Sequence, residues 1–289
     1  MKNEIEFIID PRAKDIGIEV RRLLPWVKKR MVGPFIFLDH MGPSHLKAPG
    51  DHLDVRPHPH IGLSTLTYLF EGEIFHRDSL GYRQLIVPGE VNWMTAGKGI
   101  SHSERERPEM RKVDRTVHGL QFWVALPKDL EDCDPSFTHY EQNEIPKEEN
   151  SFHQVDIVAG SRHGKVSPLK ALSPMTFQVI RAKSAGEYSY GEKDFELALY
   201  VVKGSVTIDG KEFTHEMITF KQGSTIKLSH SQDALFAVVG GIPFPEKRFI
   251  WWNLVSSSEE KIEAAKEAWK NKNFPMVPDE TEFIPLPEE

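Results

Sequence analysis

Two pairs of potential metal ligands stand out in the first half of the chain, each with one residue between its members. His58 and His60 precede a predicted strand, and His102 and Glu104 lie at a later one. Alternate residues of a strand point to the same face, so each pair can present two ligand atoms to one point. Two such pairs on neighbouring strands converge inside a small barrel. The spacing therefore predicts one metal site made of these four residues.

The alternative is that these four are unrelated polar residues in a chain with 13 histidines. A single His-x-His would be weak support for a site. Two such pairs, each beside glycines, favour the metal, because imidazole and carboxylate groups buried without partners are costly. The ligand types suit Fe, Mn, Co, Ni, Cu or Zn. We expect one divalent ion, with Fe(II) as the first candidate.

Other residues admit two interpretations each. Asp39, His40 and His52 could accept the second N–H of a ligand imidazole, or lie at the surface. Trp93 and Met94 could wall a pocket above the metal, or belong to the core. Six histidines without paired spacing are interpreted as structural or exposed: His76, His118, His139, His153, His163 and His215. Cys133 has no basic neighbour in the sequence to activate it, so a catalytic thiol is not expected.

The elements that would hold such a site are short strands. From residue 63 to 127, apolar runs rich in Thr, Tyr and Phe alternate with Gly and Pro turns, a rhythm typical of a sandwich or small barrel. Residues 128–153 are polar and acidic and predict a connection. The strand rhythm then restarts, and only residues 256–272 have helical periodicity, with a capping serine at 256 or 257. The fold class is therefore predicted as all-β with a C-terminal helix.

The second half of the chain repeats the first. YLFEG (68–72) matches YVVKG (200–204) at an offset of 132, and WMTAGKGISHSE (93–104) resembles TFKQGSTIKLSHSQ (219–232). Such self-similarity indicates a duplicated module. In this overlay His102 meets His230, while Tyr190, Glu192 and Gln232 take the places of the other three ligands. We therefore expect no metal in the second copy.

Composition excludes some classes of protein. The 289 residues are 39% hydrophobic and 27% charged, with a net charge of -7 and no basic excess, which disfavours direct nucleic-acid binding. One cysteine excludes an intrachain disulfide and fits a reducing compartment. No stretch approaches the roughly 20 apolar residues of a membrane span, and the start is unlike a secretory signal. A cytoplasmic monomer is the expectation.

The segments HPHIGLSTLTYLFEGEIFHRDSLG and PGEVNWMTAGKGISHSE resemble the hallmark segments of the pirin family of the cupin superfamily, and the tail from residue 249 is similar as well. The resemblance implies two tandem cupin (jelly-roll-like) β-barrels: a metal-binding barrel over 1–130, a connector over 131–153, and a metal-free barrel with the helix over 154–289. It carries the metal ligands onto His58, His60, His102 and Glu104. Ser64 departs from the family, whose members often have Glu there.

The resemblance also implies a function. Pirin-like proteins of this kind resemble quercetin 2,3-dioxygenases, which open the central ring of a flavonol with O2. Glu104 would then serve as a catalytic base as well as a ligand. The alternative is a metal-binding regulatory protein that contacts a protein partner without robust catalysis. A cavity that reaches the metal and holds a planar three-ring substrate would favour the enzyme. A purely structural metal is disfavoured, because such sites are usually closed and often thiolate-rich.

Overall fold

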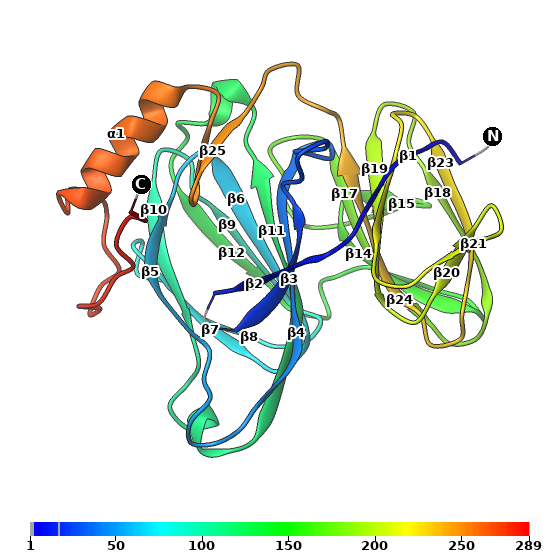
Figure 1. Cartoon of the computed structure of the whole chain (residues 1–289), viewed down its shortest axis with the longest axis horizontal. Helices are drawn as coiled ribbons and strands as arrows, with labels where there is room; N and C mark the ends of the chain where they lie inside the picture. The colour runs from blue at the N-terminus through cyan, green and yellow to red at the C-terminus, as the bar shows by residue number, and fades with distance from the viewer. Residues whose placement is uncertain (1–2, 17, 289) are drawn as a thin grey trace. The chain divides into compact units, whose positions relative to one another are not determined.

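The computed structural model describes residues 3–16 and 18–288, and β-strands make up most of it (Figure 1). The chain divides into two compact units, each built around one cupin barrel. The unit that holds the first cupin contains Ala13–Arg21, Asp39–Gln142 and the chain from Pro245 onward. The unit that holds the second contains the N-terminal segment up to Arg12, Arg22–Leu38 and Asn143–Phe244.

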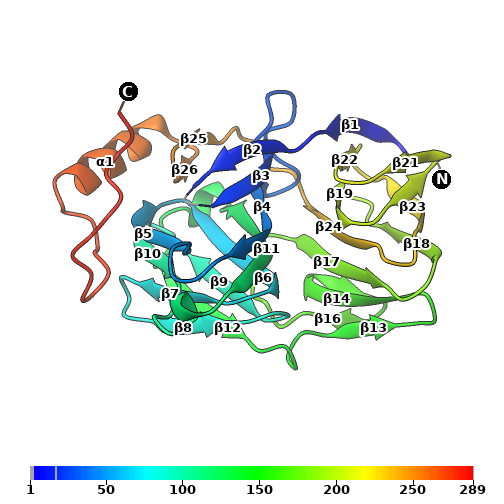
Figure 2. The ribbon, with the colours of Figure 1, turned by 60° about the horizontal axis from the view of Figure 1, so that its bottom comes forward.

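The first cupin has a seven-stranded sheet in the order β12-β9-β6-β11-β4-β3-β2 and a four-stranded sheet in the order β5-β10-β7-β8. The large sheet comprises β2 (Arg12–Asp15), β3 (Glu19–Leu24), β4 (Phe35–Leu46), β6 (Leu63–Glu71), β9 (Val91–Thr95), β11 (Arg115–Ala125) and β12 (Ser136–Tyr140). The small sheet comprises β5 (Asp54–His60), β7 (Ile74–Asp78), β8 (Arg83–Ile86) and β10 (Ile100–Arg105). Figure 2 shows these four strands side by side.

The second cupin repeats this arrangement, with sheets in the orders β1-β22-β19-β24-β17-β14-β13 and β18-β23-β20-β21. The large sheet comprises β1 (Ile5–Ile9), β13 (Lys147–Glu149), β14 (His153–Ala159), β17 (Met175–Ala182), β19 (Glu196–Lys203), β22 (Met217–Phe220) and β24 (Leu235–Gly241). The small sheet comprises β18 (Gly186–Gly191), β20 (Val206–Ile208), β21 (Lys211–Phe213) and β23 (Thr225–His230). The matching orders confirm the duplicated all-β module that the sequence predicts.

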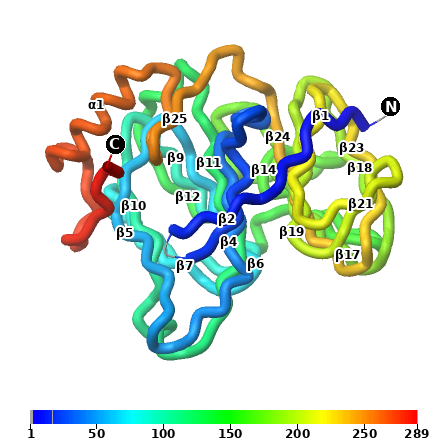
Figure 3. The backbone as a smooth tube through the Cα atoms, viewed as in Figure 1, coloured from blue at the N-terminus to red at the C-terminus, as the bar shows by residue number. Residues whose placement is uncertain are grey.

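Three segments belong to a different unit than the sequence-based ranges give them: the N-terminal strand, part of the expected connector, and the chain from Pro245 onward, which was expected with the second cupin and belongs with the first. Strand β1 pairs with β22, so the N-terminal segment belongs with the second cupin (Figure 3). Residues 136–140 of the expected connector form β12, which pairs with β9 of the first cupin. This segment is a strand because Phe137 and Tyr140 are buried while Ser136 and Thr138 stay exposed. The two edge strands β1 and β12 thus occupy equivalent places in their sheets.

Shorter elements complete the chain. They are the 3-10 helices Met110–Lys112 and Lys128–Leu130, the hairpin β15 (Ser161–Arg162) with β16 (Lys165–Val166), the hairpin β25 (Phe249–Trp251) with β26 (Leu254–Ser256), and helix α1 (Glu259–Lys270). Within the described residues, none of the helices is long and apolar enough to cross a membrane.

Helix α1 packs on the hairpin β25–β26 (Figure 1). Its buried stripe is Ile262, Ala265 and Trp269, as the helical spacing predicts. The predicted cap at residue 256 or 257 is wrong. Ser258 is the N-cap, and its Oγ accepts the Lys261 N–H at 3.4 Å. The preceding serines instead bind Glu131, which explains why the helix begins later.

A buried ion pair fixes the entry to this helix. Glu131 and Arg248 have almost no solvent exposure and lie 3.1 Å apart, measured from Oε1 to Nε. Glu131 also accepts hydrogen bonds from the Ser256 hydroxyl at 3.0 Å and the Ser257 N–H at 2.8 Å. Arg248 donates to the Leu126 carbonyl at 2.9 Å. One carboxylate therefore connects the C-terminal segment to the first cupin.

We predict that Glu131→Gln lowers the free energy of unfolding by about 3–5 kcal/mol, because it removes the buried counter-charge of Arg248 and leaves it with the more exposed Glu246, at 3.5 Å. Urea unfolding measures this value. Asp134→Asn is the control, since the Asp134–Lys98 ion pair is exposed and contributes little. If the two variants were equally stable, the buried pair would not hold this segment.

Candidate metal centre

Strands β5 and β10 bring three of the predicted ligands together. The two strands are antiparallel, and their register sets His58 directly opposite His102, while His60 lies opposite Ile100. Strand β10 also pairs with β7, so it lies in the middle of the small sheet. All three histidine side chains are buried. The alternation of a strand therefore does position the imidazoles as the sequence spacing indicates.

The three imidazoles converge on one point. One nitrogen from each of His58, His60 and His102 lies within 4.8 Å of the others. The ring centroids are 4.4 Å apart for His58 and His102, and 5.0 Å apart for each of the other two pairs. Among the described residues this group alone has the composition and spacing of a metal site. A buried cluster of three imidazoles suits a divalent transition metal.

Hydrogen bonds fix the orientation of two of these rings. His58 Nδ1 lies 2.9 Å from the Arg56 carbonyl, and His60 Nδ1 lies 3.1 Å from the Asn253 carbonyl. A carbonyl oxygen only accepts, so each Nδ1 must carry the proton and donate it. In a neutral imidazole the other nitrogen, Nε2, then has a free lone pair. The Nε2 atoms of His58 and His60 are therefore available to bind a metal.

The third ring is held by another histidine. His102 Nδ1 lies 3.3 Å from His76 Nδ1, and His76 Nε2 lies 2.9 Å from the Asp78 carboxylate. The spacing of His76 predicts only a structural or exposed histidine, so this contact with a ligand ring does not follow from that interpretation. A signal was present, since His76 and Asp78 form a third pair with i, i+2 spacing and lie on β7, the neighbour of β10.

The contact between two of the rings depends on which nitrogen of His102 carries the proton. His60 Nε2 and His102 Nε2 lie 3.1 Å apart, and the proton of His60 is on Nδ1, toward Asn253. With the His102 proton on Nδ1, the tautomer that binds a metal through Nε2, two lone pairs face each other and repel, and a shared positive charge relieves the repulsion. Burial, which removes hydration, lowers the pKa of His58 to about 4 and holds the pKa values of His60 and His102 well below their usual range. The rings are therefore neutral, the form that binds metal.

Glu104 lies apart from this cluster. Its carboxylate is not within 4.8 Å of all three nitrogens, and its Oε1 lies 3.5 Å from the Thr67 hydroxyl. The same hydroxyl donates to Gln121 Oε1 at 2.8 Å. Glu104 keeps some solvent contact, yet the hydration it loses raises the pKa of its carboxyl to about 7. Near neutral pH this group can therefore hold or release a proton.

The turn after His60 explains how Asn253 reaches the site. Gly62 has a φ of +66°, and a Cβ there would lie 2.0 Å from the Val255 carbonyl oxygen. Only glycine fits both the backbone conformation and this approach. Ile61 forms a parallel bridge to Leu254 of the hairpin β25–β26. The hairpin is thereby docked at the end of β5, with its Asn253 carbonyl against His60.

The structure decides between the two interpretations of several other residues near the site. The Nδ1 atoms of the ligands meet Arg56, Asn253 and His76, which excludes the first of the two interpretations of Asp39, His40 and His52. The surface interpretation holds for His52, while Asp39 and His40 are buried. His40 stacks on His118 with 2.8 Å between their Nε2 atoms, and His52 contacts the Gly50 carbonyl. Trp93 and Met94 are buried; Met94 packs with Ala96, Ile100 and Phe137.

The overlay of the two halves needs one correction. In the second cupin, Gly186 of β18 lies opposite His230 as His58 lies opposite His102, and Tyr188 follows it. The counterparts of His58 and His60 are therefore Gly186 and Tyr188, not Tyr190 and Glu192. One offset fails because the chain from Gly186 to Tyr200 is four residues longer than the chain from His58 to Tyr68.

The interior of the second cupin offers a poor metal site. Tyr188 and Tyr190 belong to its apolar core. The His230 Nε2 atom lies 3.1 Å from His153 Nδ1, and the Tyr188 hydroxyl donates to Gln178 at 2.9 Å. Two imidazoles in contact with each other, inside apolar surroundings, leave few donors for a metal. The absence of a metal here stays a prediction.

Comparison with known proteins identifies the family. The N-terminal pirin domain model matches residues 17–124, and the pirin C-terminal cupin domain model matches residues 177–275. A pirin-like protein of Caulobacter vibrioides is 46% identical over 98% of this chain and 100% of its own length. The chain belongs to the pirin family.

Solved structures agree with this assignment. A crystal structure of quercetin 2,3-dioxygenase from Acinetobacter baumannii is similar to this pirin with a TM-score of 0.91 and 32% identity, covering 99% of this chain and 96% of the other. A second quercetin 2,3-dioxygenase structure from the same organism shares the fold, with a TM-score of 0.89 at 22% identity over 96% and 100%. The two-cupin fold predicted from the sequence is confirmed.

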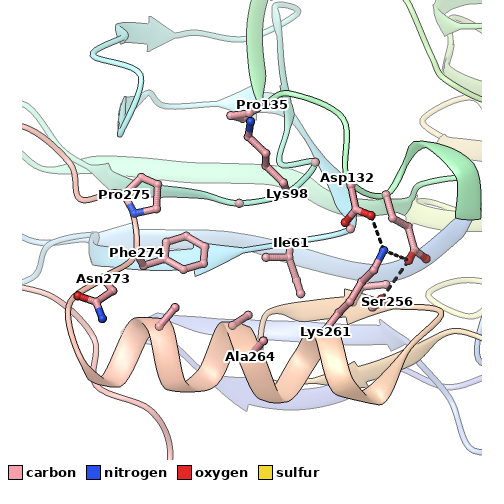
Figure 4. A pocket seen from close by; sticks show the side chains of 17 residues that line it. Ile61, Lys98, Asp132, Pro135, Ser256, Lys261, Ala264, Asn273, Phe274 and Pro275 are labelled. Atoms are coloured by element: carbon pink, nitrogen blue, oxygen red, sulfur yellow. Dashed lines mark hydrogen bonds and ion pairs between the residues drawn. The ribbon is translucent and has the colours of Figure 1, made fainter.

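A cavity of about 420 Å³ lies between α1 and the first cupin of this pirin (Figure 4). Ile61, Ala264 and Phe274 contribute apolar walls. Lys261 lies at one end, where it pairs with Asp132 at 2.6 Å. The three clustered histidines do not line this cavity, nor the shallower hollow on β18, β20 and β23. Both hollows are separate from the histidine cluster, so neither one is the cavity that would favour the enzyme over the regulatory protein.

We predict that wild-type protein binds one divalent ion per chain and that His58→Ala or His102→Ala abolishes stoichiometric binding, because two imidazoles hold a metal much less tightly than three. Elemental analysis after equilibrium dialysis measures the ratio. His163→Ala is the control, since this ring is exposed and pairs with Glu148 in the second cupin. Full metal content in both ligand variants would contradict the assignment.

Proposed function

We propose that this pirin is a metal-dependent dioxygenase that opens the central ring of a flavonol with O2, and that Glu104 completes the metal site. The proposal rests on one observation above all. Three buried imidazoles with inward lone pairs share the first cupin with a carboxyl group whose pKa is about 7. The likeness to a quercetin 2,3-dioxygenase over nearly the whole chain supports the choice of substrate.

The residues divide the work between binding and proton transfer. His58, His60 and His102 would hold the metal through Nε2, with Fe(II) the first candidate among the ions that these ligands accept. A bound divalent metal supplies positive charge that favours the ionised 3-hydroxyl of a flavonol. Glu104 Oε1 would receive the proton of that hydroxyl, because its pKa lies near neutral pH, where a general base works best.

Neighbouring side chains prepare Glu104 for this task. The Thr67 hydroxyl has one proton and two acceptors within reach, Gln121 Oε1 at 2.8 Å and Glu104 Oε1 at 3.5 Å, so its donation to Glu104 is the longer of the two hydrogen bonds. This hydrogen bond lowers the pKa of the Glu104 carboxyl less than burial raises it, so the ionised form gains from a further partner. A metal cation nearby would be such a partner for the ionised carboxylate. Thr67 and Gln121 therefore leave the carboxylate available to the metal and the substrate.

We predict that Glu104→Gln reduces quercetin turnover on the order of 10²-fold or more while reducing metal occupancy far less, because the amide retains an oxygen donor but not a base. Quercetin loss and O2 uptake are measured together for metal-loaded wild type, metal-free wild type and the variant. Glu71→Gln, the same change at an exposed position of β6, should leave turnover unchanged.

Two results of this assay would contradict the proposal in different ways. If fully loaded wild type consumes no O2 with quercetin, the enzyme assignment is wrong for this substrate, and a regulatory protein that contacts a partner becomes the better account. If Glu104→Gln turns over normally at full metal occupancy, the metal centre stands but another group is the base.

We also predict that metal affinity falls by about tenfold per pH unit as the pH drops below about 7, because the metal must displace the proton that burial retains on Glu104. The imidazole of His58 takes up a proton only near pH 4. In Glu104→Gln the affinity should therefore stay nearly constant over the range in which wild type weakens. Chelator competition at a series of pH values measures both curves; identical curves would show that Glu104 does not bind the metal.

A further inference from the structure

His102 differs from the other two ligands in what its Nδ1 meets. His58 and His60 donate to carbonyl oxygens, whereas His102 meets a second imidazole that is itself bonded to a carboxylate. The chain of contacts runs from His102 Nδ1 to His76 Nδ1 at 3.3 Å, and from His76 Nε2 to Asp78 Oδ2 at 2.9 Å. His76 and Asp78 are 3% and 0% exposed, so water competes little for these bonds.

The donors in this chain can be ordered without ambiguity once the metal is bound. An imidazole that binds a metal through Nε2 keeps its proton on Nδ1, so His102 must donate to His76 Nδ1. His76 then carries its own proton on Nε2 and donates it to Asp78. His76 can accept from His102 at Nδ1 because its own proton is on Nε2, where Asp78 accepts it.

The far end of the chain is rigidly held. Asp78 Oδ1 accepts the N–H groups of Leu80 and Tyr82 at 2.9 and 3.1 Å, so the carboxylate is locked by the turn that follows β7. The His76 ring stacks on Phe137, with a centroid distance of 4.4 Å and an interplanar angle of 14°. Neither side chain can rotate away without losing several contacts.

We propose that Asp78 acts through His76 as a positioning relay that holds His102 in its metal-binding tautomer and strengthens it as a ligand. An imidazole that donates to a partner backed by a carboxylate is the more basic ligand. His76 and Asp78 thereby act on the metal without touching it. This inference rests on the metal centre of the proposed function, and it goes further by assigning a role to two residues outside the predicted ligand set.

Asp78→Asn tests the direction of the relay with little change in shape. The amide oxygen can still accept from Leu80 and Tyr82, but the amide nitrogen now faces His76 Nε2 as a donor. His76 must then accept at Nε2 and carry its proton on Nδ1, where it meets the donor of His102. Releasing that conflict moves the His102 proton to Nε2, the atom that the metal needs.

His76→Phe and Glu90→Gln complete the set of variants. His76→Phe keeps an aromatic ring against Phe137 but removes the acceptor for His102. Glu90→Gln is the matched control, because Glu90 also pairs with a histidine, His139, at 3.5 Å and accepts a backbone N–H in a turn, that of Val87 at 2.9 Å. Thermal unfolding of the metal-free proteins verifies that each variant folds.

Zn²⁺ is the probe, measured by competition with a chromophoric chelator at one fixed pH. Asp78→Asn and His76→Phe should each weaken binding by about 10- to 100-fold, and Glu90→Gln by less than about twofold. In protein with ¹⁵N-labelled histidine, His76 should carry its proton on Nε2 in zinc-loaded wild type and on Nδ1 in metal-free Asp78→Asn, a change that loss of packing alone would not produce.

The outcomes separate the two claims. If wild type binds no Zn²⁺, the metal centre itself is wrong. If wild type binds Zn²⁺ and both relay variants bind it as tightly, or if His76 in loaded wild type carries its proton on Nδ1, the relay is wrong while the proposed function stands. If one variant fails to fold, the other variant and the wild-type tautomer still decide the question.

Discussion

In their metal-binding tautomers the imidazoles of His58, His60 and His102 turn their lone pairs toward one point and repel each other, and the first cupin holds the three rings in that arrangement. The arrangement persists because Nδ1 of His58 and of His60 is committed to a carbonyl oxygen and that of His102 to His76. Protonation of one ring would relieve the repulsion, but burial disfavours it, because burial lowers the pKa values of the three rings. A bound cation remains as the charge that satisfies all three rings together.

The surrounding fold maintains this constraint from outside the barrel. Residues of β10 that alternate with the ligands point outward and bind the C-terminal segment: the Ser101 hydroxyl donates to the Pro275 carbonyl at 2.5 Å, and the Ser103 hydroxyl donates to Glu280 at 2.6 Å. Arg105 binds the same carboxylate at 2.8 Å. The tail therefore supports the strand that carries His102, just as the hairpin before α1 supplies the carbonyl that holds His60.

The sequence predicted those features that depend on local pattern. Strand alternation was enough to place His58, His60 and His102 together, because i, i+2 spacing fixes direction regardless of the rest of the fold. It could not show that Asn253, far along the chain, would supply an acceptor, since that contact depends on tertiary packing. His76 was overlooked because its partner, Asp78, was not considered with it. The sequence also did not predict that the N-terminal strand joins the second cupin while the C-terminal segment belongs with the first, because the residue pattern of an edge strand does not identify the sheet that it joins.

The most direct test of this account is an anomalous-difference map from crystals of the metal-loaded protein. The account predicts one strong peak in the first cupin, at roughly 2.0–2.2 Å from Nε2 of His58, His60 and His102. A carboxylate oxygen of Glu104 should complete the set of protein ligands. A peak bound through any Nδ1 atom, a peak beside His153 and His230 in place of this one, or no peak in fully loaded crystals would contradict it.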